Sequence, residues 1–148
     1  HVTSALKNTF DNFSFIEGEI TTFNKFTISG FLQEDFFDEK PEETYSRWNK
    51  TRDFCFQIIR GKRTPLGFKI VLALPEDQVP YFLTAHGLTG YRPEEIRGLY
   101  LNFHYDGHHL QCITGTSLNT FTMDKSIERE WDQEVKNILK SRSIEGDY

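Results

Sequence analysis

The sequence has few of the features that mark secreted or membrane proteins. Its 148 residues include two cysteines, Cys55 and Cys112, and no apolar run approaches the roughly 18 residues of a membrane-spanning helix. No segment combines the basic start, apolar middle and small-residue cleavage site of a signal peptide. Both cysteines lie among apolar residues, which favours two buried, reduced thiols over a disulfide. These absences predict a cytoplasmic protein with no membrane partner.

Patterns that would assign a reaction are also missing. No G-x-S-x-G elbow surrounds Ser117, and the glycine spacing of a phosphate-binding loop does not occur. Glu17 and Glu19 share one face of a predicted strand, and a solvated surface explains them without acid–base catalysis. The sequence therefore predicts no catalytic residue and no cofactor.

Aromatic residues, in contrast, are abundant. They make up 15% of the chain, including 14 Phe, which indicates a large packed interior. The length fits one domain that buries a full core without a structural metal. We predict a single α+β domain over residues 1–148, with frayed ends at 1–9 and 143–148.

Hydrophobic periodicity places the elements along the chain. It predicts strands within 10–37 with a turn at Asn24-Lys25, a helix over 44–61, a central apolar strand over 66–74, a short helix over 75–87, a hairpin over 99–113, a third strand over 118–123 and an amphipathic helix over 124–142. The loop 38–44 is expected to begin the first helix, and "TGTS" (114–117) to be a tight connection between strands. The fold class is a mostly antiparallel, curled sheet with the three helices packed on it.

The predicted hairpin brings two histidines together. A two-residue turn at Asp106-Gly107 pairs Phe103 with Leu110. It makes His104 and His109 cross-strand neighbours, with Cβ atoms about 5 Å apart. Two imidazoles at this spacing are candidate zinc ligands, but a zinc site needs three or four, and a solvated hairpin tip explains the same residues. We therefore predict no metal.

Charge is spread unevenly along the chain. The net charge of −5 disfavours bulk binding to nucleic acid. Residues 47–69, however, contain seven basic residues and one acidic residue, a net charge of +6 against −11 for the remainder. The candidate anion-binding residues are Arg47, Lys50, Arg52, Arg60, Lys62 and Arg63.

Several of these residues also have a structural explanation. Basic side chains around Gly61, where the predicted helix ends, compensate the helix dipole. Arg52 lies on the apolar stripe of that helix, where it would stack on Trp48 or pair with an internal carboxylate. Arg47 and Lys69, however, lie outside the reach of the dipole at the helix end, so part of the basic charge exceeds what the helix requires.

The uneven charge favours a non-catalytic binding or accessory protein whose basic face meets an anionic small molecule or an acidic protein surface. An alternative is an enzyme acting on a small phosphorylated or nucleotide substrate, with Arg52 as anchor and His104 or His109 as acid or base. A third interpretation is a homodimer formed through a sheet edge or an aromatic patch.

Several stretches together resemble a known family. They are "FDNFSFIEGEITTFNKFTISGFL", "IRGKRTPLGFKIVLAL", "GLYLNFHYDG", "TGTSLNTFTMDKS" and "REWD". The chain resembles, from about Phe10 to its last helix, a family of small proteins of anaerobic Gram-positive bacteria that is known only as a domain of unknown function. The resemblance implies a cytoplasmic, single-domain protein and transfers no catalytic residue.

Overall fold

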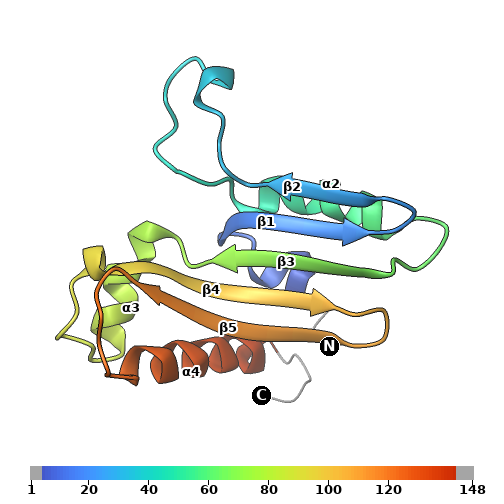
Figure 1. Cartoon of the computed structure of the whole chain (residues 1–148). Helices are drawn as coiled ribbons and strands as arrows, with labels where there is room; N and C mark the ends of the chain where they lie inside the picture. The colour runs from blue at the N-terminus through green and yellow to red at the C-terminus, as the bar shows by residue number, and fades with distance from the viewer. Residues whose placement is uncertain (1–4, 143–148) are drawn as a thin grey trace.

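Five antiparallel strands form one sheet in the order β2-β1-β3-β4-β5 (Figure 1). The computed structural model describes residues 5–142. The strands are β1 (Ser14–Thr21), β2 (Lys25–Ser29), β3 (Gly67–Ala73), β4 (Ile96–Tyr105) and β5 (Leu110–Leu118). The apolar strand β3 is central, as its sequence predicts, and it is buried on both faces from Ile70 to Ala73.

The helices connect and cover these strands. They are the π-helical turn η1 (Ala5–Thr9), the 3-10 turns η2 (Glu34–Phe36), η3 (Glu76–Gln78) and η4 (Pro93–Glu95), and the α-helices α2 (Trp48–Ile59), α3 (Val79–Ala85) and α4 (Ser126–Ser141). This arrangement confirms the predicted α+β class. No helix within residues 5–142 combines the length and the apolar character needed to cross a bilayer.

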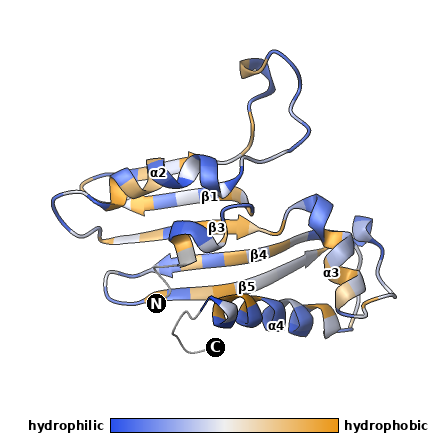
Figure 2. Cartoon of the chain, turned by 180° about the vertical axis from the view of Figure 1, so that it is seen from behind, coloured by the Kyte–Doolittle hydropathy of each residue, from blue (hydrophilic) through white to orange (hydrophobic). Residues whose placement is uncertain are grey.

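One face of the sheet carries the core, and the other, which we call the open face, bears no helix within residues 5–142 and buries only Val71 and Ala73 of β3. Helix α2 packs on β1 and α4 on β5, and Figure 2 shows both helices in front of the same face. Side chains buried beneath them include Phe15 of β1, Ile70 of β3 and Phe103 of β4. On the opposite face, strand alternation leaves polar side chains such as Lys69 and His104 exposed.

The predicted buried stripe of the last helix is confirmed. Ile127, Trp131, Val135 and Leu139 of α4 are all buried. The indole N–H of Trp131 donates to the Tyr100 carbonyl at 3.0 Å and so ties the helix to β4.

Residues 5–9, expected to fray, form the turn η1 and contribute to the core. Leu6 in η1 is buried, and its carbonyl accepts a hydrogen bond of 2.7 Å from the indole N–H of Trp48. Helix α2 therefore rests on the start of the chain. Residues 1–4 and 143–148, also expected to fray, lie outside the described residues.

Helix α2 begins at Trp48 and not in the loop 38–44. The residues immediately before it are held in extended pairing, because Ser46 donates to the Gly30 carbonyl and accepts from Phe15. Backbone groups committed to these bonds cannot enter a helix.

The last hairpin differs from its predicted register. Phe103 pairs with Cys112 and not with Leu110, which pairs with Tyr105. The Asp106 carboxylate accepts hydrogen bonds from the N–H groups of His108 and His109 at 2.8 and 2.7 Å, and this stabilises a four-residue loop in place of a two-residue turn. Gly107, with φ of +97°, provides the left-handed residue that the loop needs.

The tight connection expected between two strands is instead part of strand β5. The "TGTS" residues 114–117 lie inside β5 and pair with β4 as far as Leu118. The separate third strand predicted over 118–123 does not form, because Leu118 ends β5 and residues 119–123 are in no strand. Threonine favours strands through its branched Cβ, and this preference outweighs the turn propensity of the glycine.

Both cysteines are free thiols. Cys55 of α2 is fully buried, and Cys112 is half-buried on β5. Burial raises the pKa of Cys55 to about 11 and that of Cys112 to about 12. Neither thiol is activated as a nucleophile at neutral pH.

Candidate functional site

A cavity of about 610 Å³ lies between the turn of the β1–β2 hairpin and the loop that joins α2 to β3. We call it the loop cavity. Its apolar lining comes from Phe23 and Phe26 of the hairpin, Ile58 of α2 and Leu66 of the loop. Phe23 is 87% exposed and Leu66 is 70% exposed, so the apolar wall opens directly to solvent. An apolar surface left open in this way is typical of a binding site.

The local sequence explains why the loop stands beside the hairpin. Helix α2 ends at Ile59, and Pro65 prevents the chain from continuing as a helix. The Leu66 N–H then donates to the Thr21 carbonyl at 2.8 Å, which fastens the loop to the end of β1. Gly67 follows and enters β3.

Two basic residues of the loop, Lys62 and Arg63, line this apolar cavity. Within residues 5–142, no carboxylate lies within 4.0 Å of the charged nitrogens of either side chain. Thr22 also lines the cavity, and its buried hydroxyl finds no hydrogen-bond partner in the described part of the chain. The cavity thus combines an apolar wall with positive charge that the fold does not neutralise.

Arg60 lies on the other side of the same loop. Its guanidinium stacks over the Phe56 ring at 5.2 Å from the centroid. It lines a separate cavity of about 470 Å³ together with Lys7 and His108. The cluster predicted around Gly61 is therefore divided between two cavities, with Lys62 and Arg63 in the larger one.

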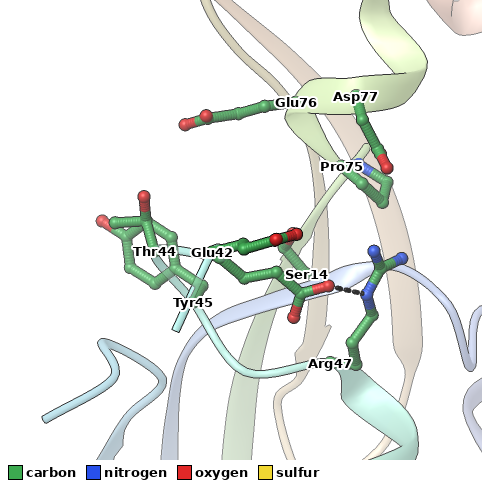
Figure 3. A pocket seen from close by; sticks show the side chains of 9 residues that line it. Ser14, Glu42, Thr44, Tyr45, Arg47, Pro75, Glu76 and Asp77 are labelled. Atoms are coloured by element: carbon green, nitrogen blue, oxygen red, sulfur yellow. Dashed lines mark hydrogen bonds and ion pairs between the residues drawn. The ribbon is translucent and has the colours of Figure 1, made fainter. Parts of the chain in front are cut away.

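Arg47 is engaged within the fold at the opposite end of α2. Its guanidinium contacts the Glu43 carboxylate and the Asn12 carbonyl, both at 2.6 Å. Figure 3 shows it at the edge of a cavity of about 360 Å³ that is also lined by Glu42, Glu76 and Asp77. The carboxylates that line this cavity would repel an anion, and the Arg47 guanidinium there already has partners.

Arg52 also has internal partners. It pairs with the Asp11 carboxylate at 3.4 Å and donates to the Lys7 carbonyl. The Asp11 contact is an ion pair without hydrogen-bond geometry, since the Arg52 Nε and an Asp11 oxygen remain buried without a hydrogen-bond partner. Lys50, on the same helix, is exposed. The structure therefore does not bring Arg47, Lys50 and Arg52 to the loop cavity.

The two candidate histidines do not form a pair. His104 faces Gln111 across the strands, and His109 lies in the loop after β4. No group of three or more His, Cys, Asp or Glu side chains in the described ranges is arranged to hold a metal. His104 points to the open face of the sheet, whereas Arg52 packs against η1 on the covered face, so the two are separated by the sheet.

A histidine that the sequence analysis did not single out, His86, links two helices through two carboxylates. Nδ1 of His86 lies 3.1 Å from Glu130 and Nε2 lies 2.8 Å from Glu134, so the ring bridges the end of α3 to α4. Partial burial alone would lower the pKa of His86, but the hydrogen bonds and charges of the two carboxylates raise it above its ordinary value. The i, i+4 spacing of Glu130 and Glu134 was visible in the sequence, but their partner was not.

Fold and site together define a single-domain α+β protein with an open, basic and apolar cavity at one end of its central helix. The chain belongs to a family of unknown function, DUF5721, whose model matches residues 5–147. No curated protein and no solved structure matches the chain.

Proposed function

We propose that this protein is a non-catalytic binding protein whose loop cavity takes an anion that carries an apolar group. The observation that supports this most strongly is that Lys62 and Arg63 lie beside an exposed apolar wall. Neither side chain has an ion-pair partner within residues 5–142. The apolar wall favours an aromatic or aliphatic group, and the two cations favour a carboxylate or phosphate attached to it. Arg60 contributes to the positive potential from the neighbouring cavity.

The chemistry of the lining supports binding rather than catalysis. The residues that line the loop cavity include two threonines and a glutamine but no histidine, cysteine or carboxylate. Such a site has no side chain suited to act as a general base near pH 7. A ligand held there would be recognised and not transformed.

The cellular setting is part of the same proposal. We expect a cytoplasmic protein, since a small fold with two free thiols and no need of a disulfide suits a reducing compartment. The resemblance described above adds the expectation of a bacterial, anaerobic Gram-positive source.

Phenyl phosphate tests the proposal, with inorganic phosphate as the comparator. We expect calorimetric titration at about 150 mM salt, where the screening length is about 8 Å, to give tighter binding of phenyl phosphate. Burying the ring should gain on the order of tenfold in affinity over inorganic phosphate. The variant Lys62→Gln with Arg63→Gln should lose this binding.

The matched control is Arg129→Gln with Lys140→Gln, which removes the same charge from exposed positions of α4. It should bind phenyl phosphate as the native chain does. Equal affinity for phenyl phosphate in both double variants would exclude the loop cavity as the site.

A further inference from the structure

The segment between β2 and α2, residues 31–45, forms an acidic arm at the end of the molecule away from the loop cavity. It contains six carboxylates and one lysine, a net charge of −5. Figure 1 shows the arm extending beyond the sheet at the upper left. At its base, Phe31 pairs with Tyr45 in a β-bridge, and the Leu32 N–H donates to the Thr44 carbonyl at 3.0 Å.

The tip of the acidic arm presents two phenylalanines. Phe36 is 85% exposed and Phe37 is 41% exposed, and their rings contact each other edge to face at 5.6 Å. The 3-10 turn η2 fixes them next to Glu34 and Asp35. Exposed aromatic rings bordered by polar or charged residues are typical of sites that bind another protein.

The acidic arm and the loop cavity are chemically complementary. The arm offers aromatic rings beside carboxylates, and the cavity offers an apolar wall beside Lys62 and Arg63. An aromatic group next to negative charge is the ligand chemistry proposed above for the cavity.

The arm of one molecule cannot fill its own cavity. The arm leaves the fold beside the N-terminal end of α2, and the cavity lies at the C-terminal end. The 12 residues of α2 separate the two ends by about 18 Å at about 1.5 Å per residue. Figure 1 likewise shows the arm and the β1–β2 turn at opposite ends of the hairpin.

We propose that the acidic arm of one copy of this chain occupies the loop cavity of a second copy, and that two copies exchange arms about a two-fold axis. Phe36 enters the apolar wall formed by Phe23 and Leu66, and Glu34 and Asp35 face Lys62 and Arg63. This inference rests on the proposed function of the cavity and names its partner. A two-fold arrangement satisfies both contacts at once and closes the assembly as a dimer.

Charge exchange between the two surfaces tests the proposal in the full-length chain. The arm variant is Glu34→Lys with Asp35→Lys, and the cavity variant is Lys62→Glu with Arg63→Glu. Each variant alone opposes like charges at both contacts and should sediment as a monomer. Mixed together, they pair opposite charges at both contacts and should form a heterodimer, whereas the native chain forms a homodimer.

Sedimentation velocity at about 100 μM protein is the measurement, since we expect contacts confined to one arm and one cavity to bind at the weak end of the affinity range. The matched control replaces the cavity variant by Arg129→Glu with Lys140→Glu on α4, which carries the same charge change away from the cavity. This control should dimerise by itself and should gain nothing from mixing with the arm variant. A monomeric native chain, open polymers, or a dimer unchanged by the arm and cavity variants would overturn the proposal.

A further variant, Phe36→Ser, separates the two proposals. It removes the ring that would compete for the cavity, so phenyl phosphate should bind to it at least as tightly as to the native chain. If phenyl phosphate binds but every variant sediments alike, only the exchange of arms is wrong. If phenyl phosphate fails to bind even this variant, the proposed function of the cavity is wrong as well.

Discussion

The two ends of helix α2 use the same kind of residue in different ways. At the N-terminal end, Arg47 and Arg52 contact two carbonyls and the Asp11 carboxylate of the segment before β1, and Arg47 also pairs with Glu43 of the acidic arm. At the C-terminal end, Lys62 and Arg63 line an apolar cavity and have no ion-pair partner within the described residues. The first end is stabilised by its charges, whereas the second presents them to solvent.

The difference lies in what surrounds each basic residue. The segment from η1 to β1 packs against the N-terminal half of α2 and brings Asp11, the Asn12 carbonyl and the Lys7 carbonyl to it. At the other end the neighbouring hairpin turn contributes phenylalanine side chains and a threonine instead. A basic residue is thus structural or available according to the segment that folds against it, not according to its own sequence position.

The largest effect is expected from Trp48→Ala at the anchored end. The indole is fully buried, packs on Phe15 with ring centroids 5.6 Å apart and donates to the Leu6 carbonyl. Its loss should lower the free energy of unfolding by about 3–5 kcal/mol in urea titration. Phe23→Ala at the open end should change it by less than about 0.5 kcal/mol, because that ring is exposed.

Trp48→Phe keeps the experiment informative if the alanine variant does not fold. It retains an aromatic ring but leaves the Leu6 carbonyl without its donor, so a smaller loss is expected. Equal losses for the Trp48 and Phe23 variants would mean that the two ends contribute alike to stability.

Replacing single basic residues should give an intermediate effect. Arg52→Gln removes the donor to the Lys7 carbonyl and the partner of Asp11, so we expect a loss of about 1–2 kcal/mol in the same titration. Arg63→Gln removes one positive charge from the other end and should be nearly neutral. A larger loss for Arg63→Gln than for Arg52→Gln would reverse the assignment of the two ends.

Sequence patterns predicted the elements in which the positions of the apolar residues show which side is buried. The 3.6-residue spacing of Ile127, Trp131 and Val135 identified α4, and the apolar run after Pro65 identified the central strand β3. The hairpin register was wrong because the Asp106 side chain, not the Asp106-Gly107 dipeptide, determines the length of the loop. A side-chain acceptor of this kind leaves no periodic signal.

The candidate site was predictable only in part, for a related reason. The local excess of basic residues pointed to the loop that holds Lys62 and Arg63. It gave no sign that Arg47 and Arg52 would find partners 35 and 45 residues earlier in the chain. The exposed Phe23 and the acidic arm were likewise not recognised, because exposure depends on tertiary packing and not on residue type.

A smaller effect should appear with pH at the contact between α3 and α4. The pKa of His86 is raised in the fold, so its contribution to stability is fully present below about pH 6.5, its unfolded pKa, and is lost as the pH rises through the folded value. We expect the melting temperature to fall over this interval. In Glu130→Gln with Glu134→Gln, where the imidazolium loses both carboxylates, this part of the fall should disappear.

The matched control for the pH experiment is Glu17→Gln with Glu19→Gln on the open face of the sheet, which removes the same charge far from His86. It should retain the pH dependence of the native chain. A direct check is the titration of the His86 ring by NMR, since a folded pKa at or below 6.5 would contradict the assignment.

The smallest effect on stability should come from Lys62→Gln with Arg63→Gln, and its smallness is informative. Side chains without partners in the described structure leave no buried group unsatisfied when they are removed, so the free energy of unfolding should change by less than about 0.5 kcal/mol. The same double variant should lose phenyl phosphate binding. If the double variant keeps the stability of the native chain but loses phenyl phosphate binding, Lys62 and Arg63 serve the ligand and not the fold. A clear loss of stability would instead show that Lys62 and Arg63 are structural charges, like Arg47 and Arg52.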